Sequence, residues 1–464
     1  MTISSADTEK DLKFLERLIE TSGPQGLQGL QADGSKQPPI ENIVFEGGGA
    51  KGIVYIGALE VLEEAGIKPK RVAGSSAGGI IAGLVAAGFS AEEIKHVMTV
   101  EMNLLDLMDS RTTWDPKLKG FPIGFSNIVN LFKHKGLFKG DAFKKIMTGL
   151  LKRKLEEGLK QVLKNKHPDY PESGIIHLLD EILEKYHIAD LGHITFGQMH
   201  ALKEDYPELG LLDLYITTTR LTDGSLKVFS HEQDPNAEVV EAVRITMSFP
   251  FAFEPVYYQG HYYADGGIAN NSPMSIFDRA QFLSHGLNDA GVNPCTVGFL
   301  TDSQEEIDQR WGVKTDAPKV KDLGFNNYIQ SILASTHVRA DELRDKYSVN
   351  TVQIHDTGIK TLGFDLKPHE IKAGIQSGRE ETKNYLSLYR NPETPYASKP
   401  PVEDLYQHYF SLSTLQLEEA YEATLDTIAE ITGLLTMIEE GALDALKKEV
   451  ALKLSQYQEE EIKK

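Results

Sequence analysis

The stretch Arg71-Val72-Ala73-Gly74-Ser75-Ser76-Ala77-Gly78-Gly79-Ile80-Ile81 predicts a short apolar strand that turns into a helix of small residues. At the turn stands Gly-x-Ser-x-Gly, with Ser76 at its centre. A serine on such a turn needs small neighbours because the two backbones pass closely, and Gly74 and Gly78 supply that space. The helix would direct its positive N-terminal end toward the Ser76 oxygen. The pattern indicates a nucleophile, but the pentapeptide alone is also typical of an ordinary tight turn, so a second motif is required.

Composition places the chain among folded globular proteins. It has 464 residues, of which 41% are hydrophobic and 25% charged, enough for two or three domains with a sizeable core. The formal net charge of −20 argues against general binding to nucleic acid. The single cysteine, Cys295, excludes an internal disulfide framework and lies in a mostly apolar run, which indicates a buried thiol.

Segments that would direct or anchor the chain to a membrane are not expected. The N-terminal residues lack a basic region followed by an apolar core, so no Sec-type signal peptide is predicted. The longest nearly apolar run, 78–89, is shorter than the roughly 20 residues that span a bilayer. We therefore expect a soluble protein, cytoplasmic or exported without a cleaved signal, that meets membranes only peripherally.

The residues before the Ser76 turn indicate parallel α/β organisation. Ile43-Val44-Phe45 predicts a strand, Glu46-Gly47-Gly48-Gly49-Ala50-Lys51-Gly52 a glycine loop, and the residues up to Gly66 a helix. Strand, loop, helix, strand and helix within about 50 residues is typical of parallel strands with short crossovers. Further strands are expected at 212–219, 226–229, 296–300 and 350–354, and a further helix at 237–245.

Three regions are expected along the chain. Residues 1–38 would form an N-terminal helix and a flexible linker, because apolar residues at helical spacing precede a stretch rich in Gly, Gln, Ser and Pro. Residues 39–390 would form the main domain. After a group of prolines, residues 402–464 carry apolar residues at spacings of three and four. They predict a helical region that packs on the main domain or on itself, or that contacts a partner or lipid.

Two internal segments allow more than one interpretation. Residues 114–138 carry five large aromatic side chains and would be either a lid or an insertion anchored to the core. Lys133–Lys166 carries a local charge of +8 interleaved with apolar residues. That pattern fits an amphipathic helix on an anionic lipid surface, and it also fits a solvated helix face, which is the commoner case.

The glycine loop requires a function of its own. Residues 47–52 match the dinucleotide pattern G-x-G-x-x-G, but the next strand delivers no carboxylate to hold a ribose. A phosphate-binding P-loop would need Lys-Ser or Lys-Thr after the last glycine, where Ile53 stands. Consecutive glycines between a strand and a helix leave backbone N–H groups unobstructed, which suits an oxyanion on a bound acyl group. We therefore predict Gly48 and Gly49 as oxyanion donors for a reaction at Ser76.

A base is the remaining requirement, and Asp265 is the best-placed residue by context. It ends an aromatic strand and is followed by Gly266 and Gly267, which allow another loop or a substrate to approach closely. Asp-Gly-Gly alone is usually a turn. An aspartate in water is too weak a base for a serine, so Asp265 must lie against Ser76 and be partly desolvated.

Together these motifs resemble those of the patatin-like phospholipase family. The similarity rests on Glu46–Gly52, Gly74–Gly78 and Asp265–Gly267, which occur in the family's order, and it covers roughly residues 40–390. It implies a three-layer α/β/α fold with a mainly parallel central sheet. It also implies a lipid acyl hydrolase of phospholipase A type, which cleaves fatty-acyl esters through an acyl-enzyme intermediate. No metal or other cofactor is implied.

The resemblance also assigns roles to individual residues. Ser76 would be the nucleophile, Asp265 the proton acceptor, and Gly47, Gly48 and Gly49 the oxyanion hole. The motif residues around them would support this site: Lys51, Gly52, Gly74, Gly78, Gly266 and Gly267. The chain departs from the family at Glu46, where aspartate is common, and at Lys51, where arginine is common. Lysine keeps the charge but lacks the bidentate fork that would orient a phosphate.

Two rival interpretations stay open from the sequence. A Ser-His-Asp hydrolase would use a histidine that follows Asp265 in the chain: His285, His337, His355, His369 or His408. None has a supporting motif, and His261 lies too close to Asp265 along the same strand. The second rival is a non-catalytic module that binds a membrane or a protein on a hydrolase scaffold, against which the presence of all three motifs argues.

The expected partner is a phospholipid or another fatty-acyl ester. Peripheral membrane contact would run through Lys133–Lys166 or through the C-terminal helices. A protein activator stays open, and nucleic acid is not expected as a partner.

Overall fold

The computed structural model describes residues 38–102, 136–288, 291–303, 346–347, 350–359, 361 and 366–389. These residues all belong to one compact unit of the chain. The predictions for residues 1–37, for the aromatic segment up to residue 135, for His337 and His408, and for residues 402–464 lie outside the described residues. The division into three regions therefore stays a prediction.

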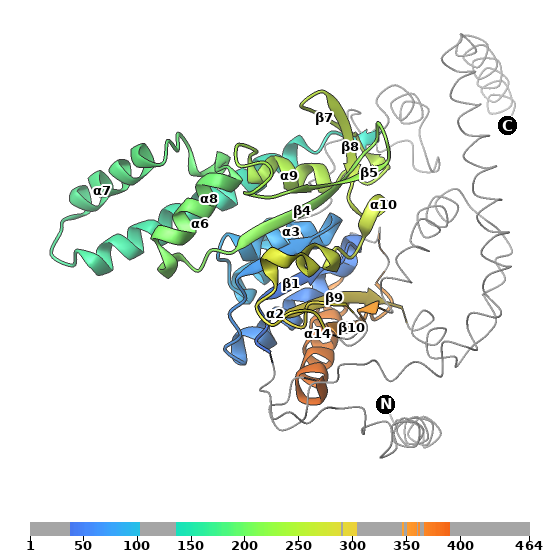
Figure 1. The fold of residues 1–464 in the computed structure, drawn as a ribbon. Helices are drawn as coiled ribbons and strands as arrows, with labels where there is room; N and C mark the ends of the chain where they lie inside the picture. The colour runs from blue at the N-terminus through green and yellow to red at the C-terminus, as the bar shows by residue number, and fades with distance from the viewer. Residues whose placement is uncertain are drawn as a thin grey trace, which may run out of the picture. The chain divides into compact units, whose positions relative to one another are not determined.

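A sheet of eight strands forms the centre of this unit (Figure 1). Neighbouring strands are parallel in the order β10-β9-β1-β2-β4, and β8, β7 and β5 join antiparallel on the β4 side. The strands are β1 Asn42–Phe45, β2 Arg71–Gly74, β4 Asp213–Arg220, β5 Ser225–Phe229, β7 Val256–Tyr258, β8 His261–Asp265, β9 Thr296–Asp302 and β10 Thr351–His355. A separate parallel pair joins β3 Gly136–Phe138 to β6 Phe251–Phe253.

The pairing of β4 brings two strand ends together. β5 lies along one edge of β4, so β2 and β8 share the other edge. On that edge β2 ends at Gly74 beside Ile216, and β8 ends at Asp265 beside Thr218. Because β2 and β8 run in opposite directions, their carboxyl ends face each other. The residues that follow Gly74 and Asp265 therefore meet at one place.

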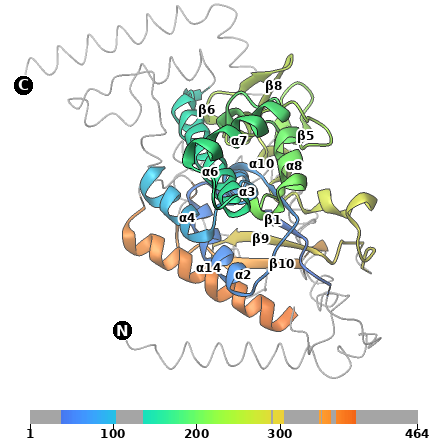
Figure 2. The ribbon, with the colours of Figure 1, turned by 90° about the vertical axis from the view of Figure 1, so that its left-hand side faces the viewer.

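Helices cover one face of the sheet. α2 (Val54–Glu64), α3 (Ser76–Ala86), α9 (Val239–Thr246) and α14 (Pro368–Tyr389) contribute to the apolar core on this face. α14 lies beside α2 (Figure 2). Glycines allow this close approach, since a Cβ on Gly57 would lie 1.9 Å from the Ile375 carbonyl oxygen and a Cβ on Gly378 2.0 Å from that of Val54.

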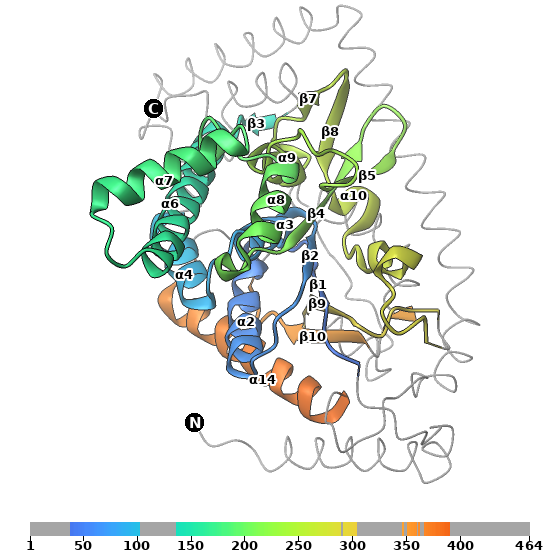
Figure 3. The ribbon, with the colours of Figure 1, turned by 60° about the vertical axis from the view of Figure 1, so that its left-hand side comes forward.

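The opposite face of the sheet is covered by the chain that follows Asn271. The 3-10 helices η7 (Met274–Asp278) and η8 (Ala280–Phe282) form a second apolar cluster with Val44, Ala73 and Tyr215 of the sheet. This segment, yellow in Figure 3, lies on the side of the strands away from α2 and α14. The predicted class, a three-layer α/β/α fold with a mainly parallel sheet, is confirmed.

Further helices extend from the helical face. They are α4 Ala91–His96, the π-helix η3 Val97–Glu101, α6 Asp141–Lys166, α7 Glu172–Lys185 and α8 Phe196–Asp205, with short 3-10 helices η2 Gly49–Ile53, η5 Leu191–His193 and η6 Pro207–Leu209. Ser90 and Glu93 form a capping box at the start of α4. Among the described helices, none combines the length and the apolar character that crossing a bilayer requires.

α6 carries most of the predicted basic segment. Its apolar residues are buried in the core: Phe143, Met147, Leu150, Leu151, Leu155, Leu159, Val162 and Leu163. This face is therefore not available for insertion into lipid. Its basic residues form ion pairs with carboxylates of the same chain: Lys144–Glu241, Lys152–Asp190, Arg153–Glu101, Lys154–Glu93, Lys160–Glu156, Lys164–Glu172 and Lys166–Glu208. The structure supports the solvated-face interpretation, and a membrane contact of this segment stays a prediction.

The predicted strands agree with the observed ones within one or two residues, and the expected helix at 237–245 is α9, Val239–Thr246. Parallel strands are buried on both faces, which is why β1 and β9 show continuous apolar runs in the sequence. Cys295 is fully buried, as expected from its apolar neighbours.

Candidate active site

Ser76 lies on the sharp turn between β2 and α3. Its backbone φ is +51°, which is uncommon for a residue other than glycine and indicates a strained turn. Both flanking positions require glycine because other backbone atoms approach them closely. A Cβ on Gly74 would lie 2.3 Å from the Gly78 carbonyl oxygen, and a Cβ on Gly78 would lie 2.3 Å from the Phe45 carbonyl oxygen. The predicted strand-to-helix elbow is therefore present, with Ser76 as its first helical residue.

Thr246, the last residue of α9, fixes the elbow from outside. Its Oγ1 accepts a hydrogen bond from the Ser76 N–H at 2.8 Å and donates to the Thr217 carbonyl oxygen at 2.6 Å. Thr246 is fully buried, so neither contact competes with water. One hydroxyl thus connects the strained residue to strand β4.

Ser76 and Asp265 are in direct contact. The Ser76 Oγ donates to Asp265 Oδ2 at 2.6 Å, and the Gly267 N–H donates to the other carboxyl oxygen at 2.7 Å. Asp265 is only 2% exposed. Burial raises the pKa of Asp265 from 3.8 to about 7, while the hydrogen bonds from Ser76 and Gly267 partly counteract this rise.

The backbone of Asp265 is held on both sides. Its N–H donates to the Ser248 carbonyl oxygen at 3.0 Å, and its carbonyl oxygen accepts from Thr219 Oγ1 at 2.7 Å. Gly266 must be glycine because a Cβ there would lie 2.2 Å from the Thr217 carbonyl oxygen. These contacts keep the end of β8 directed at the Ser76 elbow.

The glycine loop lies against the same serine. A Cβ on Gly47 would lie 2.9 Å from the Ser76 Cβ. Asn271 forms two hydrogen bonds with Gly47. The Asn271 carbonyl oxygen accepts from the Gly47 N–H at 3.1 Å, and the Asn271 Nδ2 donates to the Gly47 carbonyl oxygen at 3.0 Å. A Cβ on Gly267 would meet Asn271 Oδ1 at 2.7 Å, so Asn271 connects the glycine loop to the turn after Asp265.

The predicted oxyanion donors differ in their availability. The Gly47 N–H donates to the Asn271 carbonyl oxygen, so in this conformation Gly47 shapes the loop, and its place in the oxyanion hole stays a prediction. The N–H groups of Gly48 and Gly49 have no hydrogen-bond partner among the described residues. Gly49 has φ of +57°, a conformation that favours glycine.

Lys51 is held by a buried acid rather than left free. Its Nζ lies 2.7 Å from Asp356 Oδ2, and Asp356 is almost fully buried directly after β10. The neighbouring Ala50 N–H donates to the Thr361 carbonyl oxygen at 2.9 Å. A Cβ on Gly52 would lie 3.5 Å from the Ala77 Cβ, which is an ordinary contact distance. The chain after β10 therefore anchors the glycine loop.

No described histidine contacts Ser76 or Asp265. His285 lies against Cys295, His261 lies near Thr222, and His369 is on α14. His355 ends β10, where its carbonyl oxygen accepts from Ser377. Among the described residues the geometry therefore offers no histidine between serine and aspartate.

No role was predicted from the sequence for three residues that shape this site: Thr246, Asn271 and Asp356. Of these three residues, only Asn271 lies near a motif, because the segment Asn271-Ser272-Pro273 closely follows Asp265-Gly266-Gly267. Thr246 and Asp356 stand in ordinary helix-end and strand-end sequences and carried no signal.

A serine on a strand-to-helix elbow, a carboxylate in contact with it and a loop with free amides define the class of serine acyl hydrolases. The family model for patatin-like phospholipase matches residues 43–278, and the chain belongs to that family. The matched residues, which include Ser76 and Asp265, therefore form a domain of the patatin-like phospholipase family.

Individual relatives share less than a third of the aligned residues with this chain. The uncharacterized protein YqhO of Bacillus subtilis (strain 168) is 31% identical over 240 residues, which cover 51% of this chain and 66% of that protein. The probable lipid hydrolase 463L of Invertebrate iridescent virus 6 is 24% identical over 237 residues, which cover 51% of this chain and 62% of that protein. The chain therefore matches somewhat less than two thirds of the length of these two relatives. The solved structure of VipD from Legionella pneumophila overlaps with a TM-score of 0.44 at 19% identity, covering 76% of this chain and 67% of that chain.

Proposed function

We propose that this chain is a phospholipase A type enzyme that cleaves fatty-acyl esters of phospholipids through a Ser76–Asp265 dyad. The observation that carries the proposal is the direct hydrogen bond of 2.6 Å between Ser76 Oγ and the buried Asp265 carboxylate. A serine that donates to a desolvated carboxylate can lose its proton as it attacks, without a histidine between them.

The first half of the reaction acylates Ser76. Its Oγ attacks the acyl carbonyl carbon while its proton moves to Asp265 Oδ2. The carbonyl oxygen becomes an oxyanion, which the N–H groups of Gly48 and Gly49 stabilise. The intermediate then collapses, and Asp265 returns the proton to the departing alcohol oxygen, which leaves with the lysophospholipid.

The second half releases the fatty acid. Asp265 takes a proton from water as the water oxygen attacks the acyl-enzyme carbonyl carbon, and the same two amides stabilise the second oxyanion. Collapse breaks the ester bond to Ser76, whose oxygen recovers the proton from Asp265. The dyad is then back in its starting state, and the products are a fatty acid and a lysophospholipid.

Lys51 has a supporting role in this proposal. Because its ammonium is paired with the buried Asp356 carboxylate, it stabilises the glycine loop rather than a substrate phosphate. Recognition of the phospholipid head group is therefore assigned to other residues, and a protein activator stays a prediction.

The decisive experiment compares Ser76→Ala with Ser75→Ala. Ser75 is the neighbouring serine, and its Oγ is buried without a hydrogen-bond partner in the described structure, so its removal controls for the loss of a hydroxyl at the elbow. Fatty-acid release would be measured on mixed phospholipid vesicles and on a soluble short-chain ester.

We expect Ser76→Ala to lower kcat/KM by a factor of at least about 10³ on both substrates, and Ser75→Ala to remain within a few-fold of wild type. Equal release by wild type and Ser76→Ala would refute the proposal and favour a non-catalytic module. A comparable loss on alanine substitution of one of the histidines that follow Asp265, with folding intact, would favour a Ser-His-Asp hydrolase: His285, His337, His355, His369 or His408.

A further inference from the structure

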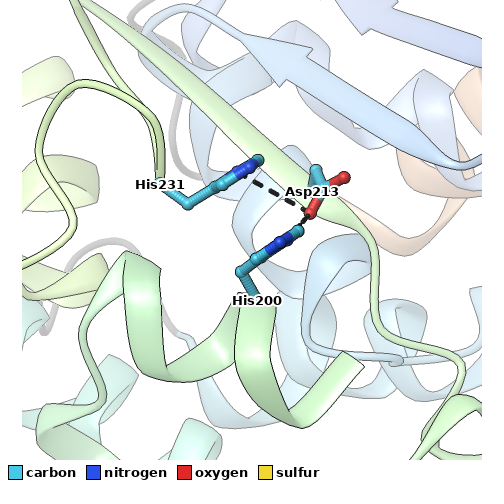
Figure 4. Close-up of side chains that lie close together, drawn as sticks. All are labelled: His200, Asp213 and His231. Atoms are coloured by element: carbon cyan, nitrogen blue, oxygen red, sulfur yellow. Dashed lines mark hydrogen bonds and ion pairs between the residues drawn. The ribbon is translucent and has the colours of Figure 1, made fainter. Parts of the chain in front are cut away.

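His200, Asp213 and His231 come together from three elements at the first residue of strand β4 (Figure 4). His200 is on α8, Asp213 begins β4, and His231 follows β5. The Nδ1 atoms of His200 and His231 lie 2.7 Å and 3.7 Å from the same Asp213 Oδ1 atom. Among the described residues, this is the group whose potential metal-ligand atoms all lie within 4.8 Å of one another.

The position of Asp213 separates this cluster from the dyad. Asp213 pairs with Arg71 at the start of β2, whereas Ser76 follows Gly74 at the end of that strand. Three steps of extended chain, about 10 Å, separate Arg71 from Gly74. The cluster therefore has no part in acyl transfer and needs an explanation of its own.

Two carboxylates at the cluster are each held by a neighbouring side chain. Lys203 Nζ lies 2.8 Å from Asp213 Oδ2, and the Tyr215 hydroxyl donates to Glu232 Oε1 at 2.6 Å. The other oxygens, Asp213 Oδ1 and Glu232 Oε2, both face His231 Nδ1, the latter at 3.6 Å. Such outer contacts are the kind that hold metal-binding carboxylates in position.

His231 Nδ1 is left without a hydrogen bond by this arrangement. The atom is buried and has no hydrogen-bond partner in the described structure, although two carboxylate oxygens lie just beyond hydrogen-bonding distance. A buried polar atom without a partner is costly. A cation placed between Nδ1 and the carboxylate oxygens would remove that cost.

We propose that His200, Asp213 and His231 bind a divalent transition metal ion of the zinc type. Imidazole nitrogens with a carboxylate oxygen are a donor set that Zn²⁺ accepts, with bonds of about 2.0–2.2 Å. Ligand atoms of a tetrahedral site with such bonds lie roughly 3.3 Å apart, and the two separations from Asp213 Oδ1 bracket that value.

Binding requires the two imidazoles to leave their present stacking. Their ring centroids are 3.8 Å apart at an interplanar angle of 5°, so the ring planes must tilt before both Nδ1 lone pairs point at one ion. The side chains have partial access to solvent, 34% exposed for His200 and 18% for His231, and solvent would fill the remaining coordination position. The ion would join α8, β4 and the chain after β5, and so stabilise the fold.

The test uses the full-length protein after treatment with a chelator, with Zn²⁺ and Co²⁺ added as chloride salts. Calorimetry would measure zinc stoichiometry and affinity, and visible absorption would report four-coordinate Co²⁺. The variants are His231→Ala and His200→Gln, and His193→Ala is the matched control because His193 is a half-exposed histidine paired with Glu238 outside the cluster.

We expect one zinc ion per chain, a rise in Tm of several degrees with saturating zinc, and the visible bands of bound Co²⁺. Either cluster variant should weaken zinc binding by more than about 100-fold, whereas His193→Ala should keep wild-type affinity. Loss of a residue that only supports a metal ligand typically costs about 10- to 100-fold, so a larger loss indicates a direct ligand. Absence of stoichiometric binding or of the cobalt bands in wild type would overturn the proposal, whatever the variants do. Retained affinity in both cluster variants would also overturn it. Ser76→Ala should bind zinc normally, which separates this inference from the proposed hydrolase activity.

Discussion

Replacing Asp265 by asparagine should abolish hydrolysis and make the protein more stable at alkaline pH. The substitution keeps the shape and both contacts: asparagine Oδ1 accepts from the Gly267 N–H, and Nδ2 donates to Ser76 Oγ. What it removes is a charge that the fold buries at a cost. Catalytic groups are often held in such unfavourable states, and their removal then raises stability.

The size of this gain in unfolding free energy follows from the pKa of Asp265. That pKa is about 7 in the folded chain, whereas the ordinary value is 3.8. Between these two pH values the folded chain binds a proton that the unfolded chain has released. The free energy of unfolding of wild type therefore falls as pH rises from about 4 to 7, and it is constant above that range. At 1.36 kcal/mol per pKa unit, this gives Asp265→Asn an advantage of about 4 kcal/mol at pH 8 and only about 1–2 kcal/mol at pH 5.

Urea unfolding of both proteins at pH 5 and pH 8, followed by circular dichroism, would measure this difference. The matched control is Asp223→Asn, since Asp223 is a partly exposed carboxylate paired with Arg220, and that contact lowers its pKa. This control should not gain stability at pH 8. If Asp265→Asn were less stable than wild type at pH 8, or if its advantage did not grow with pH, the assignment of Asp265 as a buried and destabilised carboxylate would be wrong.

Two further predictions concern the dyad and its support. The kcat/KM for a soluble ester should rise with pH through an apparent pKa near 7, because Asp265 must be ionised to accept the Ser76 proton, and activity is lost below that pH. A carboxyl pKa hardly changes with temperature, so a marked fall of this apparent pKa on warming would indicate a histidine instead. Thr246→Val leaves the Ser76 N–H without its partner and should cost about 1–3 kcal/mol of unfolding free energy and lower kcat more than KM, whereas Thr246→Ser should retain both. Wild-type kcat in Thr246→Val would show that the elbow does not depend on this contact.

The sequence predicted best those features that are made by neighbouring residues. The Ser76 elbow could be found because Gly74, Ser76 and Gly78 stand within five residues and each meets a local steric demand. The strands of the parallel sheet were visible as short apolar runs because both their faces are buried.

Contacts between residues far apart in the chain were harder to predict from the sequence. The Ser76–Asp265 contact spans 189 positions, so it was predicted from the combination of motifs and the family resemblance rather than from periodicity. Thr246 lies 170 positions from Ser76, and its role depends on where α9 packs, which no local pattern encodes. The histidine and aspartate cluster was missed for the same reason, because its members have no metal-motif spacing along the chain.

Strand β1 lies between β2 and β9, and this position affects how the chain folds while it is being translated. β1 pairs with β2 on one side and with β9 on the other, and the loop that follows it is held by Thr361 and Asp356. Residues beyond the family match at 43–278 are thus needed to complete the sheet and to fix the glycine loop.

A ribosome adding about 5–20 residues per second needs roughly 15–60 s to pass from Ser76 to Thr361. During that interval Ser76 has emerged, but β1 stays an edge strand until β9 is made, and the loop that carries the Gly48 and Gly49 amides lacks its anchors until Asp356 and Thr361 follow. The order of elements along the chain therefore delays assembly of the proposed catalytic site until Thr361 has been synthesised, and it leaves nascent chains dependent on protection of an exposed strand edge.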